Sequence, residues 1–251
     1  TSTPDTGEGG KPSDPEGGEG ADGTLATTPV TINNGHVDLR VMEDEGNFTV
    51  ALGDDSRQHA KKSVTRTIDS TTLEVTKLAK ATRGGNILAD KSYDVLGPEG
   101  TELYVLPQAQ QQGRVWPGFS SEALDRDKYP EGATMTLTPV SAPKGAKWFA
   151  YTEGLGTLEK LYASSDKASD IPLPPGTHMH TACAFTKPGT YTIDVTARAK
   201  AAKNGERSAE PGEVTAMTQR LTFVVGEQPG GDQGGAEVED PSDDNPAQPG
   251  K

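Results

Sequence analysis

Apolar and polar residues alternate along most of the chain between about residues 28 and 226. Val37, Leu39 and Val41, for example, are each separated by a polar or charged residue. Alternation with a period of two predicts a β-strand that buries one face. Runs of this kind, rich in valine, leucine, threonine and aromatic residues, cover 29–33, 36–42, 46–52, 72–76, 102–106, 134–140, 147–152, 190–199 and 216–225.

Helix signals are few, and only residues 120–127 and 158–163 are expected to form a turn or two of helix. Turn dipeptides separate the strand-like runs, with Asn34-Gly35 before the second run and Asn204-Gly205 in the loop between the last two. Tyr191 follows Pro-Gly-Thr as in the tyrosine corner of immunoglobulin-like domains. The pattern predicts an all-β protein, an elaborated immunoglobulin-like β-sandwich.

Composition divides the chain into a central domain and two acidic tails. Residues 1–27 hold six acids and one lysine, and residues 227–251 hold seven acids and one lysine, so about −2 of the net charge of −13 remains between them. Both tails are rich in glycine and proline, which predicts disordered acidic linkers. We expect residues 28–226 to form one elaborated domain, the alternative being two small sandwiches that meet near residue 130.

Several functional classes are disfavoured by the same composition. The nearly neutral central domain offers no basic surface for nucleic acid, and no apolar run has the roughly 20 residues that span a bilayer. The chain opens with Thr-Ser-Thr-Pro-Asp and not with a signal peptide, so we expect a mature or trimmed protein. A single cysteine, Cys183, excludes an internal disulfide framework.

The segment 106–122 does not alternate. Its Trp-Pro-Gly-Phe sequence at 116–119 is expected to form a rigid turn around Trp116. The indole then either plugs an open end of the sandwich or forms one wall of a ligand pocket, with Glu122 as a second wall residue. The sequence leaves both alternatives open.

Three histidines are the candidate metal ligands. His178 and His180 are two residues apart on a predicted strand, so both imidazoles face the same side and Met179 faces the other. His36 begins a strand that could lie beside them. Three imidazoles suit zinc or another divalent transition metal. Alternatively, these histidines face solvent or satisfy buried hydrogen bonds. The fourth histidine, His59, lies in a polar loop and looks incidental.

Enzyme chemistry is not expected. Cys183 is three positions after His180, so the two side chains point to opposite faces of a regular strand, and a buried structural thiol is the expected role of Cys183. No Gly-x-Ser-x-Gly elbow, phosphate-binding loop or His-Glu-x-x-His sequence occurs.

Five motifs in order resemble a known family: Gly-His-Val-Asp-Leu (35–39), Leu-Pro-Gln (106–108), Trp-Pro-Gly-Phe-Ser-Ser-Glu (116–122), His-Met-His (178–180) and Ala-Phe-Thr-Lys-Pro-Gly-Thr-Tyr (184–191). Together they resemble the actinobacterial surface-anchored protein domain, also called the choice-of-anchor M domain. The resemblance covers roughly residues 30–226. It implies an exported (secreted) protein attached to the cell wall or the membrane, often encoded beside a metal-type ABC transporter for nutrient uptake.

Two departures from the family stand out. The family commonly continues its His-x-His with Asn-Trp, whereas Ala182 and Cys183 follow Thr181 here. No Leu-Pro-x-Thr-Gly sorting signal or hydrophobic tail follows Val225, so we expect the anchor to lie outside this chain.

The sequence therefore favours an extracellular, cell-surface module that binds a zinc-like divalent metal, or a metal-bearing ligand, alongside an ABC-type uptake system. One alternative is an adhesin or stalk module that binds host or envelope components without metal. A second is haem binding, with a histidine as axial ligand and Trp116 or Tyr191 lining the pocket.

Overall fold

The computed structural model describes residues 24–85, 87–202 and 212–226. Nearly all regular structure in this part of the chain is β-strand, as predicted. The acidic stretches 1–23 and 227–251 and the Asn204-Gly205 turn lie outside the described residues. Within the residues that the structure describes, no helix is both long and apolar enough to cross a membrane.

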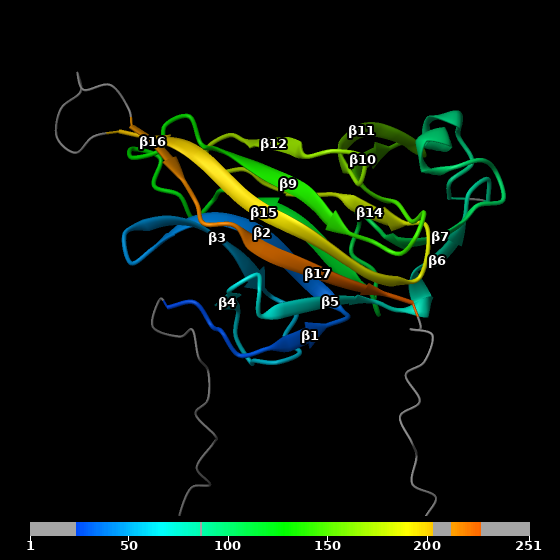
Figure 1. Ribbon diagram of the computed structural model, residues 1–251, viewed down its shortest axis with the longest axis horizontal. Coiled ribbons are helices and arrows are strands. Elements are labelled where there is room, and N and C mark those ends of the chain that lie inside the picture. Colours follow the sequence, from blue (N-terminus) through cyan, green and yellow to red (C-terminus); the bar gives the residue numbers. More distant parts are fainter. Residues whose placement is uncertain (1–23, 86, 203–211, 227–251) are drawn as a thin grey trace, which may run out of the picture.

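A seven-stranded sheet forms one layer of the molecule (Figure 1). Its strands lie in the order β1 (Val30–Ile32), β5 (Thr71–Val75), β17 (Gln219–Val225), β15 (Gly189–Ala201), β9 (Ala133–Ser141) and β12 (Ser169–Leu173), and β16 (Gly212–Thr215) pairs with β15. The long strand β15 is central and pairs antiparallel with β9 and β17.

Two five-stranded sheets form the other layer. The first contains β11 (Thr157–Ser164), β10 (Trp148–Gly154), β14 (Ala182–Phe185), β7 (Glu102–Leu106) and β6 (Lys80–Thr82). The second contains β13 (His178–His180), β8 (Val115–Ser120), β2 (Gly35–Asp44), β3 (Asn47–Asp54) and β4 (Val64–Arg66). Only Thr181 separates β13 from β14, so the chain passes directly from one small sheet to the other.

The main core lies between the two layers. The inward faces of β2 and β3 contribute Val37, Leu39 and Leu52, each less than one-tenth exposed. They line a small apolar cavity together with residues of the large sheet and of the first small sheet, among them Leu137, Ile193, Leu221, Phe223, Trp148 and Phe185. Alternating strands of three sheets that bury one face each against this core make the protein a β-sandwich, as the sequence predicts.

A second core lies on the outer face of the sheet that contains β10. Leu103 and Tyr151 are buried there beneath Leu88, Tyr93 and Leu96, which belong to the segment around the short 3₁₀ helix η2 (Lys91–Leu96). A shorter 3₁₀ helix, η1 (Lys77–Ala79), precedes β6. On the other small sheet, by contrast, His36, Asp38 and Arg40 of β2 alternate with its core residues, and this face carries the candidate site.

Three local predictions were wrong. Residues 158–163 are not helical but lie in β11, because pairing with β10 outweighs their weak helical pattern. Residues 120–127 form turns, with the amide of Leu124 donating to Ser121. Trp-Pro-Gly-Phe is not a turn but part of β8, an inner strand.

Strand β8 tolerates a proline because of where its pairing ends. Pro117 aligns with Val37 of β2, and β13 pairs only with residues 118–120. The carbonyl of Pro117 accepts a hydrogen bond from the amide of Thr181, so it faces the β13 side just beyond that pairing. The missing N–H of Pro117 therefore falls on the β13 side, where regular pairing has ended, and not on the side paired with β2.

The tyrosine corner is present at the start of β15. The hydroxyl of Tyr191 donates to the carbonyl of Lys187 at 2.7 Å and accepts from the amide of Lys187 at 3.2 Å. Tyr191 is fully buried. Its hydroxyl therefore holds the turn that leads into the longest strand of the sandwich.

Replacing Tyr191 with phenylalanine is expected to lower the free energy of unfolding by about 1–2 kcal/mol, because two buried backbone groups lose their partner. Urea denaturation checks this. Tyr162→Phe is the control, since the Tyr162 hydroxyl makes no hydrogen bond among the described residues. Equal midpoints for the two variants would contradict the role of the corner.

Candidate metal centre

The three candidate histidines come from strands on either side of β8. Strand β2 pairs parallel with β8 and brings His36 beside Trp116 and Asp38 beside Gly118. Strand β13 pairs antiparallel on the other side of β8 and brings His180 beside Gly118. Asp38 and His180 therefore flank a glycine, on the face opposite the core residues Val37 and Leu39.

Gly118 leaves the space in which these side chains meet. A β-carbon at this position would lie 2.2 Å from Oδ1 of Asp38, 2.9 Å from the carbonyl oxygen of Met179 and 3.0 Å from Nδ1 of His180. Any other residue at 118 would therefore displace the carboxylate or the imidazole. Glycine at the middle of β8 is a condition for the cluster.

His36, Asp38, His178 and His180 form one cluster. One potential metal-binding atom from each lies within 4.8 Å of the others. Nε2 of His36 is 3.1 Å from Oδ1 of Asp38, and Nε2 of His178 is 3.1 Å from Oδ2. The carboxylate, whose side chain is only 1% exposed, is thus shared between two imidazoles.

The other ring nitrogen of each histidine lies beside an oxygen acceptor. Nδ1 of His36 is 3.2 Å from Asp55, and Nδ1 of His178 is 3.0 Å from Glu122. Nδ1 of His180 is 3.2 Å from the carbonyl oxygen of Pro117. Metal-binding histidines characteristically donate the second ring N–H to such an oxygen. This arrangement leaves Nε2 of all three rings as the nitrogen that could bind a metal ion.

The cluster and the residues in contact with it carry more negative than positive charge. Asp38, Asp55 and Glu122 each place a carboxylate against a histidine. Among the described residues, the permanent cation paired with these carboxylates is Arg40, whose guanidinium lies 3.2 Å from Asp55 and 3.9 Å from Asp38. Three carboxylates and one guanidinium sum to a charge of about −2 with neutral imidazoles, which a divalent cation balances.

The imidazoles respond differently to these surroundings. The hydrogen bond to Asp38 raises the pKa of His36, despite its partial burial. Burial lowers the pKa of His180, which favours its neutral form. The carboxylates thus favour the protonated form of His36, and a metal ion could replace that proton. His180 is already in the form that binds metal.

Trp116 packs directly on the cluster. Its ring stacks on that of His180, with centroids 3.7 Å apart and planes 10° apart, and lies 5.0 Å from His36. The indole N–H donates to the carbonyl of Gln108 at 2.6 Å, and the side-chain oxygen of Gln108 accepts from the amide of Glu153 in β10. Trp116 is half-buried and lies against the histidine cluster.

Hydrogen bonds outside the cluster fix the two loops that complete it. The hydroxyl of Ser121 donates to the carbonyl of Pro174 at 2.6 Å and accepts from the amide of Thr177, immediately before His178. On the other side, the buried ion pair between Arg66 and Asp54 (2.8 Å) holds the start of the loop that carries Asp55. Contacts within the protein therefore hold both loops.

The structure brings His36, His178 and His180 together and places Trp116 and Glu122 in contact with them. Two carboxylates were not predicted from the sequence: Asp38, which belongs to the cluster, and Asp55, which lies beside His36. The spacing held a signal for one of them, because Asp38 lies two residues after His36 on the same strand face.

The remaining candidates lie elsewhere. His59 is exposed, and Nε2 of its ring contacts the carbonyl of Thr31 at 2.6 Å. Cys183 is buried among core residues, and burial raises the pKa of its thiol to about 12. It is therefore a structural residue at neutral pH, as expected.

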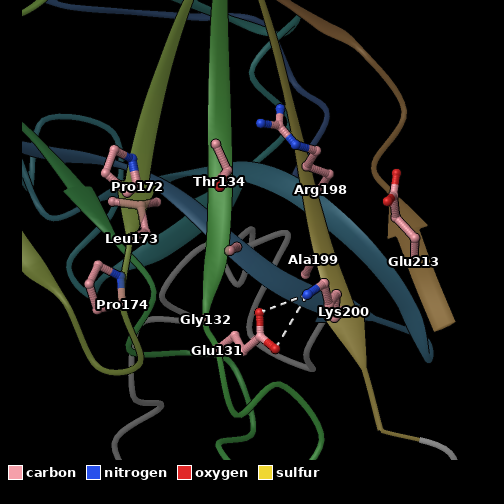
Figure 2. A pocket seen from close by; sticks show the side chains of 11 residues that line it. Glu131, Gly132, Thr134, Pro172, Leu173, Pro174, Arg198, Ala199, Lys200 and Glu213 are labelled. Carbon is pink, nitrogen blue, oxygen red and sulfur yellow. Dashed lines mark hydrogen bonds and ion pairs between the residues drawn. The ribbon is translucent and has the colours of Figure 1, made fainter. Parts of the chain in front are cut away.

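A hollow of about 210 Å³ lies at the end of the large sheet, between β12, β9, β15 and β16 (Figure 2). Its two basic side chains already have partners: Lys200 is 3.2 Å from Glu131, and Arg198 is 2.6 Å from Asp170. These side chains are about half exposed. The hollow thus lacks the buried, convergent polar atoms that distinguish the histidine cluster.

Comparison with known proteins adds no assignment. No protein-family model matches this chain, and no curated protein matches it.

Proposed function

We propose that the protein is an exported cell-surface module that binds a divalent transition metal, zinc foremost, through His36, Asp38, His178 and His180. The observation that carries this proposal is the orientation of the three imidazoles. Each Nδ1 lies beside an oxygen acceptor, and two Nε2 atoms face the same buried carboxylate.

The donor set supports a borderline metal over a hard or a soft one. Three nitrogens and one carboxylate oxygen suit zinc, whereas calcium and magnesium prefer oxygen ligands alone. Copper(I) prefers thiolate and thioether ligands. Met179, the neighbouring thioether, packs against the core on the opposite face of its strand.

The cellular setting of this proposal rests on the family resemblance. Two of the five motifs, 116–122 and 178–180, contain four residues of the cluster or its wall, and 35–39 contains two more. We propose that the domain captures the metal at the cell wall for an ABC-type uptake system. The corresponding non-metal function is adhesion to host or envelope components, which would be insensitive to chelators.

Isothermal titration of the full chain with zinc chloride tests the proposal. One zinc ion per chain is expected to bind, and the double variant His178→Ala/His180→Ala is expected to lose affinity about 100-fold or more, because two ligands are removed. Chelator treatment before the titration removes metal acquired during expression.

His59→Ala is the matched control, since it deletes a histidine outside the cluster and should bind zinc like the wild type. Identical weak heats for the wild type and the double variant would contradict metal binding. Glycan or matrix-protein binding that persists in chelator would then favour adhesion.

A further inference from the structure

We infer that the site takes a bare divalent ion into a closed, four-coordinate environment, and does not take a chelated metal or haem. This inference rests on the proposed metal-binding function and narrows it. The sequence alone leaves a metal-bearing ligand and haem as alternatives to a simple ion. The number of donors, the charge around them and the space between them distinguish these alternatives.

The cluster supplies enough ligand atoms to complete the coordination of a zinc ion. Three imidazoles and Asp38 supply four ligand atoms within 4.8 Å of one another. Four protein ligands complete the tetrahedral shell of zinc, as in structural sites, whereas catalytic sites keep a position for water or substrate. A metal that arrives with its own chelator needs such an open position. The complete set leaves none.

The charge at the rim of the site disfavours an anionic ligand. The two carboxylates that hold the outer nitrogens, Asp55 and Glu122, lie at the partly exposed rim, with side chains 25% and 57% exposed. A dication neutralises the charge of the cluster. An anionic ligand such as a citrate chelate or the propionates of haem would then approach a rim that carries Glu122 and an Asp55 paired with Arg40, so the rim offers it no excess positive charge.

Neighbouring side chains occupy the space that a porphyrin would need around the imidazole nitrogens. A porphyrin bound to Nε2 of His36 or His178 would need the position of the Asp38 carboxylate, 3.1 Å from both nitrogens. Trp116 covers one face of the His180 ring at 3.7 Å. The carboxylate occupies the space over Gly118 and lies between the two nitrogens. A flat macrocycle therefore cannot reach Nε2 of His36 or His178 while Asp38 keeps this position.

Cobalt(II) substitution reports the coordination number directly. Tetrahedral cobalt absorbs visible light far more strongly than octahedral cobalt. We expect the cobalt-loaded full chain to show the intense tetrahedral bands, and zinc to abolish them by displacement. The His59→Ala variant should give the same spectrum. Weak octahedral bands would overturn the closed site while leaving metal binding intact.

Native mass spectrometry tests the form in which the metal binds. After mixing with zinc citrate, the chain is expected to gain the mass of one zinc ion alone, and haemin is expected to produce no shifted Soret band. A complex that retains citrate, or a Soret shift lost in His178→Ala/His180→Ala, would overturn the inference. Failure to bind zinc in any form would instead refute the proposed function itself.

Discussion

Replacing Asp38 with asparagine is expected to lower the affinity for zinc about 100-fold or more, the largest effect of any single polar substitution in the cluster. Loss of an outer-shell partner costs about 10–100-fold, and loss of a ligand exceeds that. Asp38 is the buried carboxylate that two Nε2 atoms share. Asparagine preserves its shape but removes the charge that attracts the ion. Zinc titration calorimetry measures the change.

Two further variants make this result specific. Asp55→Asn weakens only the contact that orients the imidazole of His36. The affinity of this variant for zinc is therefore expected to lie between that of Asp38→Asn and that of the wild type. Asp170→Asn removes a surface carboxylate paired with Arg198 at the far hollow and should leave zinc binding unchanged. Wild-type affinity in Asp38→Asn would mean that three histidines alone hold the metal.

The fold was largely predictable because alternation is a local signal. Val37, Leu39 and Val41 are buried on one face of β2, as their spacing predicts, and Tyr191 makes the hydrogen bonds of the tyrosine corner. The sheet partners were not predictable in this way. Nothing local indicates that β2 pairs parallel with β8, or that β13 passes into a different sheet after Thr181.

Local sequence patterns likewise predicted only those features of the site that depend on a single strand. The His-x-His spacing predicts that two imidazoles share a face, and this needs only the period of a strand. Asp38 was missed because its role depends on lying next to Gly118, a neighbour 80 positions away. The Trp-Pro-Gly-Phe sequence was interpreted as a turn because proline and glycine usually mark turns. In β8, pairing on the β2 side outweighs that tendency.

Gly118→Ala is expected to abolish measurable zinc binding and to lower the free energy of unfolding of the metal-free protein by about 1–3 kcal/mol. The added methyl would lie 2.2 Å from Asp38 and 2.9 Å from the carbonyl of Met179. The first contact expels the carboxylate, and the second separates β13 from β8. Zinc calorimetry and urea denaturation measure the two effects.

Stabilisation by zinc distinguishes the loss of the site from a general loss of stability. At a free zinc concentration of 100 times Kd, the wild type is expected to gain about 2.7 kcal/mol, whereas Gly118→Ala should gain nothing. Gly212→Ala is the control, because a β-carbon there has no neighbour within 4 Å and β16 lies in the other layer. It should retain the full stabilisation.

A double-mutant cycle shows whether the clash with Asp38 is the cause. If it is, Gly118→Ala should cost less stability when Asp38 is already alanine, because the carboxylate that it displaces is gone. Strictly additive costs would contradict that mechanism and would place the whole effect on the backbone contact with Met179. The glycine would then be required for pairing β13 with β8 and only indirectly for the metal site.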